Sequence, residues 1–362
     1  MLHLRHLWLS DFRSYAAVDL ELPPGTTAVL GRNGQGKTNL LEAVAHLAGT
    51  DLRGATSEAM VRIGAERAAV RAEAVRNNRE LLIEAELAAR GRGRAQLNRQ
   101  PVKRRRDLLE ALSVTLFSPE DLVLVKGGPA ERRRWVDDAV VGLDPRTDQL
   151  RSDVDRILKQ RNALLKGVRG HLDESAALTL DVWDDRLTRA GEALVEHRRR
   201  VLDALRPRLA VAYHDLAGRQ LEVGAEYQAA WAADGLAASL AAARDQDLRR
   251  GVTTVGPHRD EIAFSLDGLP TRTHASQGEQ RSLALAMRLA VHRAMTETHG
   301  VSPILLLDDV LSELDDGRGA GLLDHLPPGQ TLLTSATALP ASTAPSLTVE
   351  VADGMVSVVD EA

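Results

Sequence analysis

The fold of this chain is decided by the stretch Gly31-Arg32-Asn33-Gly34-Gln35-Gly36-Lys37-Thr38. The stretch fits the pattern G-x4-G-K-[ST], which cradles phosphate when it follows a strand and opens a helix. Residues 26–30 predict that strand, and residues 38–48 carry apolar side chains at helical spacing. Backbone N–H groups of such a loop converge on phosphate oxygens. Lys37 would reach the β- and γ-phosphates, and the Thr38 hydroxyl would bind Mg²⁺. We therefore predict a nucleotide site; the alternative is a glycine-rich turn with a chance lysine.

A second motif supplies the acidic group that a nucleotide site needs for its metal. Ile304-Leu305-Leu306-Leu307-Asp308-Asp309 is an apolar strand that ends in two carboxylates, which is the Walker B arrangement. Because adjacent residues of a strand point to opposite faces, we expect Asp308 beside Mg²⁺ and Asp309 beyond it, where an attacking water would lie. The alternative for Asp309 is a solvated carboxylate at the end of a strand.

A third motif, Ser276-Gln277-Gly278-Glu279-Gln280, precedes an apolar helix that we predict over residues 277–298. Ser276 and Glu279 alone form a capping box, which is an ordinary helix start. A serine N-cap followed by Gly278 also exposes a hydroxyl and N–H donors at the positive end of a helix, which suits an anion. The phosphate loop upstream and the Walker B strand downstream favour the second interpretation.

The pattern of the 362 residues divides the chain into three parts. Residues 1–117 and 250–362 mix strands and helices, including hairpins predicted at 81–102 and at 347–359. Residues 118–249 read as a helical insertion. Glycines and prolines, among them Pro207, interrupt that insertion and argue against a long coiled coil.

Composition excludes several classes of protein. The chain has no cysteine, which rules out disulfides, thiolate zinc sites and iron–sulfur clusters and makes the cytosol the default location. Its N-terminus lacks the unbroken apolar region of a signal peptide, and no uncharged stretch approaches the ~18 apolar residues that suggest a membrane span. The net charge of −5 argues against a strongly basic protein.

Basic residues are nevertheless concentrated in one segment, residues 90–106, which holds no acid. Such a segment neutralises several phosphates and makes DNA binding sensitive to salt, although a solvated charged hairpin is the alternative. Aromatic residues make up only 3% of the chain, which disfavours stacking on single strands and favours contact with a duplex backbone. The candidate DNA-binding residues are Arg92, Arg94, Arg99, Arg104 and Arg105, with further candidates in 132–134 and 198–200.

Seven blocks of the chain, in order, resemble the RecF family within the ABC-type ATPase superfamily. The blocks are residues 11–15, 34–43, 116–122, 132–137, 256–260, 276–278 and 307–316. The resemblance implies an α/β fold: a P-loop head of the ABC and SMC type with a mixed sheet, formed by residues 1–117 and 250–362, and a helical lid at 118–249. The role of the block at 256–260 stays open.

The resemblance also assigns roles to residues. Lys37 and Asp309 would be catalytic, and Thr38 and Asp308 would hold Mg²⁺. Ser276, Gln277 and Gly278 would reach the ATP bound by a partner head, with Ser312 and Asp315 in the adjoining D-loop. Residues expected at the nucleotide in cis are Arg13, Gly31, Arg32, Asn33, Gly34, Gln35, Gly36, Lys37, Thr38 and Asn39; for Arg13 a surface arginine is the alternative.

RecF-like proteins bind DNA at gaps as ATP-dependent dimers, act with RecR and RecO, and promote RecA loading; the resemblance implies the same here. Two departures from the wider ABC pattern predict slow ATP hydrolysis. Asp309 stands where glutamate is usual, and residues 334–337 contain no histidine. Rival functions are the ATP-binding subunit of a membrane transporter and a passive module that binds ATP without hydrolysing it. A GTPase is disfavoured because no [NT]-K-x-D motif surrounds any lysine.

Overall fold

The computed structural model describes residues 1–50, 56–168, 172–337, 339–340 and 343–359, and only the backbone of Arg105 and Glu313. The chain forms two compact units, each built from separate segments. The first unit contains Met1–Asp121, Val211–Gln220 and Gln277–Ala362, and the second contains Leu122–Ala210 and Leu221–Ser276. Among the described residues, no helix is both long and apolar enough to cross a membrane.

The first unit contains a six-stranded sheet in the order β15-β14-β3-β13-β12-β8, which is parallel except for β15. The strands are β3 Thr26–Leu30, β8 Val114–Phe117, β12 Ile304–Leu307, β13 Thr331–Ser335, β14 Leu347–Ala352 and β15 Met355–Val358. Every residue of β12 and β13 is buried, as expected for parallel strands covered on both faces. The carboxyl ends of β3, β12 and β13 therefore meet at one edge of the sheet, which is where ligands bind in such folds.

A second sheet of the same unit is antiparallel, in the order β2-β1-β4-β5-β6-β7. Its strands are β1 Leu2–Phe12, β2 Tyr15–Glu21, β4 Arg67–Arg76, β5 Arg79–Ala88, β6 Arg94–Leu97 and β7 Gln100–Pro101. The strand predicted at 95–102 is thus divided, because Asn98 and Arg99 both have positive φ (49° and 64°) and turn the chain. As predicted, β5 pairs antiparallel with the first part of this segment, which forms β6.

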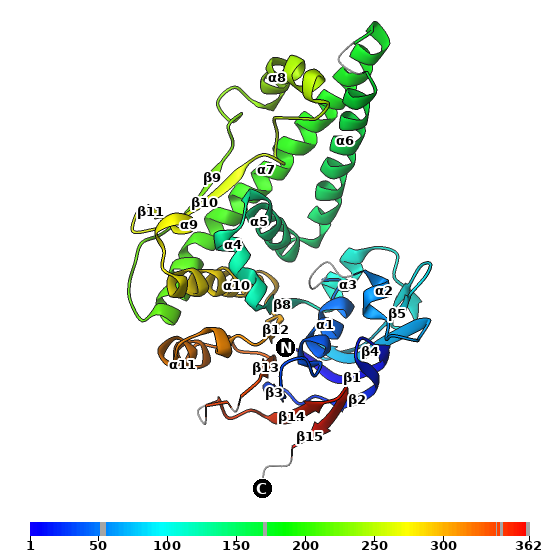
Figure 1. Cartoon of the computed structure of the whole chain (residues 1–362), viewed down its shortest axis with the longest axis vertical. Helices are drawn as coiled ribbons and strands as arrows, with labels where there is room; N and C mark the ends of the chain where they lie inside the picture. Colours follow the sequence, from blue (N-terminus) through cyan, green and yellow to red (C-terminus); the bar gives the residue numbers. More distant parts are fainter. Residues whose placement is uncertain (51–55, 169–171, 338, 341–342, 360–362) are drawn as a thin grey trace. The chain divides into compact units, whose positions relative to one another are not determined.

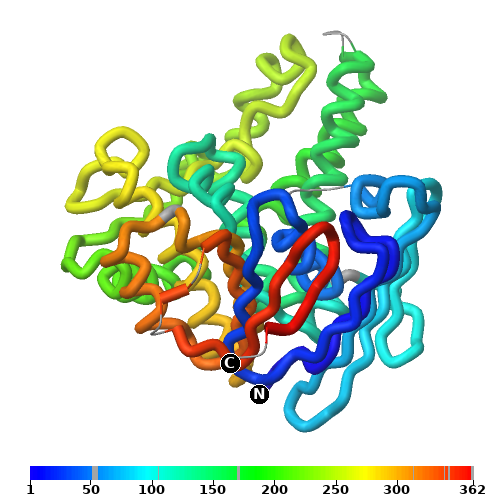
Figure 2. The backbone as a smooth tube through the Cα atoms, turned by 60° about the horizontal axis from the view of Figure 1, so that its bottom comes forward, coloured from blue at the N-terminus to red at the C-terminus, as the bar shows by residue number. Residues whose placement is uncertain are grey.

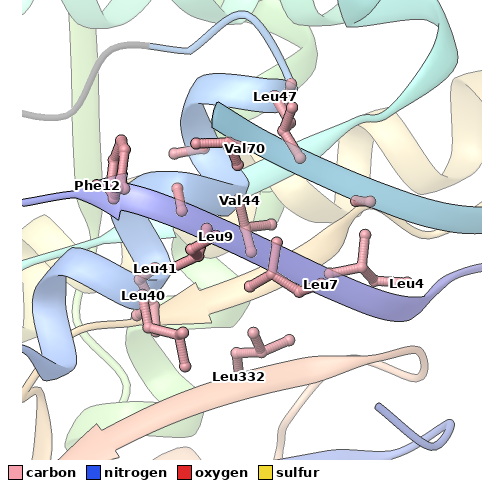
Figure 3. Packing of buried hydrophobic residues seen from close by; sticks show 14 of the residues in the cluster. Leu4, Leu7, Leu9, Phe12, Leu40, Leu41, Val44, Leu47, Val70 and Leu332 are labelled. Atoms are coloured by element: carbon pink, nitrogen blue, oxygen red, sulfur yellow. The ribbon is translucent and has the colours of Figure 1, made fainter. Parts of the chain in front are cut away.

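The helix α1, Lys37–Leu47, packs against both sheets of this unit (Figure 3). Leu7 and Leu9 of β1 share one apolar cluster with Leu41 and Val44 of α1 and with Leu332 of β13. All five side chains are almost fully buried, and each contributes about 1.5–3 kcal/mol by leaving water. This packing fixes the start of α1, and with it the phosphate loop, relative to the sheet.

Further helices and turns complete the first unit. They are α2 Ser57–Met60, α3 Arg105–Ala111, α10 Gln277–His299, η3 Leu311–Glu313 and α11 Asp316–Asp324, with the 3₁₀ turn η1 Pro119–Leu122 at its boundary. α10 covers β8, and its observed bounds agree with the helix predicted over 277–298. Figure 2 shows the C-terminal hairpin of β14 and β15, in red, beside the N-terminal strands in blue.

The second unit is mostly helical but contains a small sheet, β11-β10-β9. Its elements are α4 Val123–Lys126, α5 Pro129–Leu143, η2 Pro145–Thr147, α6 Asp148–Gly167, most of α7 Glu174–Ala217, β9 Val223–Gln228, α8 Leu236–Arg250, β10 Glu261–Leu266, β11 Leu269–Pro270 and α9 Thr271–His274. Figure 1 shows α6 and α7 side by side, and Ile157 and Leu158 of α6 share an apolar cluster with Leu187 and Leu194 of α7.

Three boundaries predicted from the sequence are wrong. Residues 250–276 belong to the second unit, because β10 pairs with β9 along its whole length and does not join either sheet of the head. Residues 118–121 and 211–220 belong to the first unit. Pro207 also does not interrupt the helix: α7 runs through it, since Leu205 and Leu209 on either side are almost completely buried and packing outweighs the lost backbone hydrogen bond.

Candidate nucleotide site

The phosphate loop lies between the carboxyl end of β3 and the start of α1, as its sequence requires. Lys37 is only 6% exposed. Its ammonium Nζ donates to the carbonyl oxygens of Gly31 at 2.7 Å and Arg32 at 3.1 Å and lies 3.5 Å from Asn33 Oδ1. The loop therefore brings four predicted nucleotide residues together and folds the lysine of the motif back onto the loop's own carbonyl groups.

The predicted metal residues meet across the sheet edge. Thr38 Oγ1 donates to the Asp308 carboxylate, at 2.8 Å from Oδ1 and 2.9 Å from Oδ2, although the two residues are 270 positions apart. Asp308 is 2% exposed. A hydroxyl and a carboxylate are hard oxygen donors, and Mg²⁺ typically takes few protein ligands and completes its shell with phosphates and water. The donor set therefore fits Mg²⁺ held together with a nucleotide.

Asp309 lies beyond the end of β12 and not on it, so alternation along a strand does not orient its side chain. Its backbone is left-handed, with φ 49°. Its N–H donates to Thr334 Oγ1 at 2.8 Å, and Thr334 Oγ1 in turn lies 2.9 Å from Asp308 Oδ1. The Asp309 Oδ1 atom is buried and has no hydrogen-bond partner among the described residues. The buried oxygen does not fit the solvated strand-end alternative.

The turn between β1 and β2 supports the phosphate loop from one side. The Tyr15 hydroxyl donates to the Gly36 carbonyl at 2.8 Å, and Asn39 Nδ2 donates to Ser14 Oγ at 3.0 Å. Burial raises the pKa of the Tyr15 phenol still further above neutral pH, so the hydroxyl is a donor there. Gly36 has φ 116°, and a Cβ there would lie 2.6 Å from Ser14 Oγ, so only glycine fits. No local pattern in the sequence indicates these supporting contacts.

The C-terminal hairpin supports the loop from another side. The Asp353 N–H in the hairpin turn donates to Gln35 Oε1 at 2.6 Å. Gly31 has φ 151°, and a Cβ there would lie 2.3 Å from the Val351 carbonyl oxygen. The Gln35 side chain, which the sequence places at the nucleotide, is thus engaged with the hairpin, over 300 residues away in the chain.

Arg13 is held by protein groups. Its Nε and Nη2 atoms donate to the two oxygens of the buried Glu42 carboxylate at 2.7 and 2.6 Å, and Nη1 donates to the Ala59 carbonyl at 2.6 Å. A bidentate arginine–carboxylate pair of this kind is geometrically specific. Arg13 therefore ties the β1–β2 turn to α1, and its contact with nucleotide stays a prediction.

The D-loop approaches both the Walker B end and the signature helix. Ser312 Oγ donates to the Asp309 carbonyl at 2.8 Å. Asp315 caps α11 by accepting from the Arg318 N–H at 3.0 Å, and it also forms an ion pair with the Arg318 guanidinium. That guanidinium lies against Gly278, where a Cβ would come within 2.6 Å of Nη1. Gln277 is the first residue of α10, and Ser276 directly precedes it at the end of the second unit.

Comparisons with known proteins agree with this geometry. A family model described as the RecF/RecN/SMC N terminal domain matches residues 3–332. The DNA replication and repair protein RecF of Frankia alni is 44% identical over 354 residues, which cover 92% of this chain and 93% of that protein. The chain belongs to the RecF family. The RecF protein of Streptomyces avermitilis is also 44% identical, over 349 residues and the same shares of both chains.

Solved structures confirm the fold of this RecF-family chain. A structure of the recombination mediator protein RecF with ATP, in the RecFOR pathway, is similar with a TM-score of 0.91 and 26% identity, covering 99% of this chain and 98% of that one. An Smc head domain with an extended coiled coil from Pyrococcus furiosus has a TM-score of 0.57 at 17% identity, covering 99% and 96% of the two chains. The predicted P-loop head of the ABC and SMC type is therefore confirmed.

The arginines predicted to bind DNA differ in their surroundings within this RecF-family head. Arg92, Arg99 and Arg104 are exposed. Arg94 is exposed but forms an ion pair with Glu86 at 2.6 Å, which reduces the charge it offers to phosphate. The side chain of Arg105 lies outside the described residues. The segment thus presents separate basic side chains from the β5–β6 loop to the start of α3.

Two further arginine candidates for DNA binding are wrong. Arg132 is 6% exposed and pairs with Glu261 at 2.6 and 2.8 Å, and Arg198 is 4% exposed and pairs with Asp137 at 2.7 and 2.8 Å. Both guanidinium groups are buried ion-pair partners inside the second unit. They are unavailable to DNA because each is already matched to a carboxylate in the interior.

The block at 256–260, whose role the sequence left open, belongs to the same buried region. Arg198 donates to the Pro257 carbonyl at 2.8 Å. Asp260 accepts from the Tyr227 hydroxyl at 2.7 Å and from the Trp231 indole at 2.9 Å. Burial raises the pKa of Asp260 and lowers that of His258 to about 4, so His258 is neutral at pH 7. The block therefore organises the interior of the second unit.

Proposed function

We propose that this chain is an ATP-dependent DNA-binding switch of recombinational gap repair. ATP draws two heads together, the paired heads hold duplex DNA beside a single-strand gap, and slow hydrolysis to ADP and phosphate releases it. One observation carries the proposal most directly: Thr38 of the phosphate loop contacts Asp308 of Walker B at 2.8 Å, so the two halves of an ATP site are assembled. The similarity to a RecF structure with ATP supports the choice of nucleotide.

The residues around this contact divide the chemistry among them. Lys37 and the backbone N–H groups of the loop bind the phosphates, and Thr38 with Asp308 holds Mg²⁺. Bound Mg²⁺ neutralises charge that develops on the transferred phosphate. Asp309 offers a buried carboxylate oxygen without a partner among the described residues, and it accepts the proton of the attacking water.

Slow turnover follows from two features of the site. Asp309 is one methylene shorter than the glutamate of related ATPases, so it reaches less far towards a water. Residues 334–337 supply hydroxyl and methyl groups in place of a histidine. We therefore propose that the ATP-bound dimer, and not rapid hydrolysis, is the working state, and that DNA stimulates a weak ATPase activity.

The partner surfaces are part of the same proposal. Ser276, Gln277, Gly278, Ser312 and Asp315 act on the ATP of the second head. Exposed arginines of the 90–106 segment contact the duplex backbone. RecO and RecR are the proposed protein partners, because the similar RecF structures are described within the RecFOR pathway, and RecA loading is the proposed outcome, in the cytoplasm.

Sedimentation combined with ATPase assays tests the switch. The parent protein is expected to dimerise with ATP but not with ADP or without nucleotide, and gapped duplex is expected to stimulate hydrolysis. Lys37→Ala removes ATP-driven dimerisation, whereas Asp309→Asn keeps it and slows hydrolysis by roughly 100-fold, since it removes a general base. Lys126→Ala, a change of an exposed lysine, serves as the control. A monomer under every condition would overturn the proposal.

Mixed dimers test the assignment of residues to opposite heads. Lys37→Ala and Ser276→Arg proteins are each expected to be inactive, whereas an equimolar mixture regains part of the activity, because one of the two sites in a mixed dimer is intact. A mixture that stays inactive contradicts action across the dimer. For the duplex contacts, Arg99→Ala should weaken binding equally for all sequences and lower the salt slope by about 1.

The same experiments separate the rival functions. A passive module predicts no DNA-stimulated hydrolysis in the parent protein. A transporter subunit predicts sedimentation with membranes and not with DNA. Membership of the RecF family argues against the transporter, because the family model that matches residues 3–332 describes RecF, RecN and SMC proteins.

A further inference from the structure

Thr334 lies between the two carboxylate residues of Walker B. It belongs to β13, which lies between β12 and β3 in the sheet, and it is fully buried. The parallel register pairs Leu333 with Leu307, which places Thr334 directly beside the point where β12 ends and Asp308 begins. A hydroxyl is thus presented to Walker B from a buried position inside the sheet.

The hydrogen bonds of this hydroxyl have a fixed direction. The Asp309 N–H can only donate, and it lies 2.8 Å from Thr334 Oγ1. A carboxylate oxygen accepts hydrogen bonds, and Asp308 Oδ1 lies 2.9 Å from the same hydroxyl oxygen. A threonine hydroxyl has one proton and two lone pairs. Thr334 therefore donates to Asp308 and accepts from Asp309, which links the two residues through one oxygen.

Asp309 needs such support because of its backbone. Its φ of 49° lies in the left-handed region, which costs a non-glycine residue on the order of 1 kcal/mol. Two hydroxyls hold it there: Thr334 accepts from its N–H, and Ser312 Oγ donates to its carbonyl at 2.8 Å. With both backbone groups held, the fold sets the backbone of Asp309, and with it the point from which the carboxylate extends, before any ligand arrives.

We infer that Thr334 is a positioning residue for ATP hydrolysis, which fixes the water-activating Asp309 relative to the metal-holding Asp308. This inference rests on the proposed ATPase function and deepens it. Residues 334–337 contain no histidine, but the end of β13 supplies the Thr334 hydroxyl, which contacts both Walker B residues.

Two substitutions at this position separate the hydroxyl from the volume of the side chain. Thr334→Val keeps the shape and removes the hydroxyl, and Thr334→Ser keeps the hydroxyl. The matched control is Thr27→Val on the neighbouring strand β3, because the Thr27 hydroxyl is buried but has no partner among the described residues. Melting curves of all three proteins show whether the sheet is intact.

Thr334→Val is expected to lower kcat by about 10- to 100-fold, the usual effect of removing a group that orients a reacting residue, with ATP affinity changed by no more than about threefold. Thr334→Ser and Thr27→Val should stay within about threefold of the parent in kcat. In the ligand-free protein, hydrogen exchange at the Asp309 amide should accelerate in Thr334→Val and not in Thr27→Val. With ATP, the Thr334→Val dimer should persist longer.

Parental kcat in Thr334→Val, or equal damage in Thr334→Ser, overturns the inference. Unchanged exchange at the Asp309 amide in Thr334→Val also overturns it. If the parent protein does not hydrolyse ATP, the proposed function has failed, and the exchange measurement still decides by itself whether Thr334 holds Asp309.

Discussion

The side chain of Gln330 completes the hydrogen bonding of the first strand, and its removal should destabilise the head. Gln330 is 2% exposed. It accepts from the Leu4 N–H at 2.7 Å and donates to the carbonyls of Leu4 at 2.9 Å and Pro23 at 3.1 Å. β1 pairs with β2 only from His6 onwards, so the Gln330 amide takes the place of a neighbouring strand at Leu4.

The magnitude follows from the groups that lose their partners. Gln330→Leu conserves the approximate volume and leaves one buried N–H and two carbonyls without this partner. An unsatisfied buried group costs about 1–3 kcal/mol, and the added apolar surface offsets part of the sum. We expect the first unit to lose about 2–4 kcal/mol of unfolding free energy, a large fraction of a typical stability of about 5–15 kcal/mol.

Hydrogen exchange is the suitable assay, because a chain with two units need not unfold in one step. Amides of β1 that exchange through unfolding of the first unit should exchange about 30- to 1,000-fold faster in Gln330→Leu, since each 1.4 kcal/mol is a factor of ten. Gln100→Leu, at an exposed position, is the control. Unchanged protection of β1 in Gln330→Leu would refute the assigned role of this amide.

Three other substitutions give measurable outcomes. Arg161→Leu in the second unit leaves the buried carboxylate of its ion pair uncompensated and should lower the unfolding free energy, measured by denaturant melting, by about 3–5 kcal/mol. The control Arg189→Leu removes an exposed ion pair and should lower it by under about 1 kcal/mol. Gly31→Ala places a Cβ 2.3 Å from a carbonyl oxygen and should weaken ATP binding more than tenfold, while Gly34→Ala meets no atom within 4 Å and should have a smaller effect in the same titration. Burial lowers the pKa of His292 to about 4, below its usual 6.5, so between these pH values the unfolded chain binds more protons than the folded chain. The unfolding free energy should therefore fall by about 2–3 kcal/mol as the pH drops from 6.5 to 4. The variant His292→Gln should show a weaker pH dependence of unfolding free energy in pH-dependent melts.

The chemical centre was predictable because its signals are local. The loop at 31–38 and the strand before Asp308 are short motifs whose spacing already requires a strand, a turn and a helix. The helix α10 and the C-terminal hairpin were predictable for the same reason: apolar periodicity and an Asp-Gly turn are properties of neighbouring residues. Helical periodicity is also local, so the general region of the helical insertion was predictable. Its boundaries were not, because they depend on which distant strands and helices each segment packs against.

Contacts between residues far apart in sequence were not predictable in this way. The alternation rule placed Asp309 on a strand, whereas the strand ends at Leu307 and a left-handed turn directs the carboxylate. Arg132 resembles an exposed basic residue in sequence, and only the fold buries it beside Glu261. Burial depends on what the rest of the chain places nearby, and no window of the sequence contains that information.

The sequence by itself therefore indicated which residues carry groups suited to phosphate and metal, because those groups lie within single motifs. Tertiary structure alone decided how those motifs are held: Thr334 joins the Walker B residues, Tyr15 and Asp353 support the phosphate loop, and Gln330 closes the first strand. The physical reason is that a hydrogen bond needs two groups within about 3 Å, and these partners come from segments that only folding brings together.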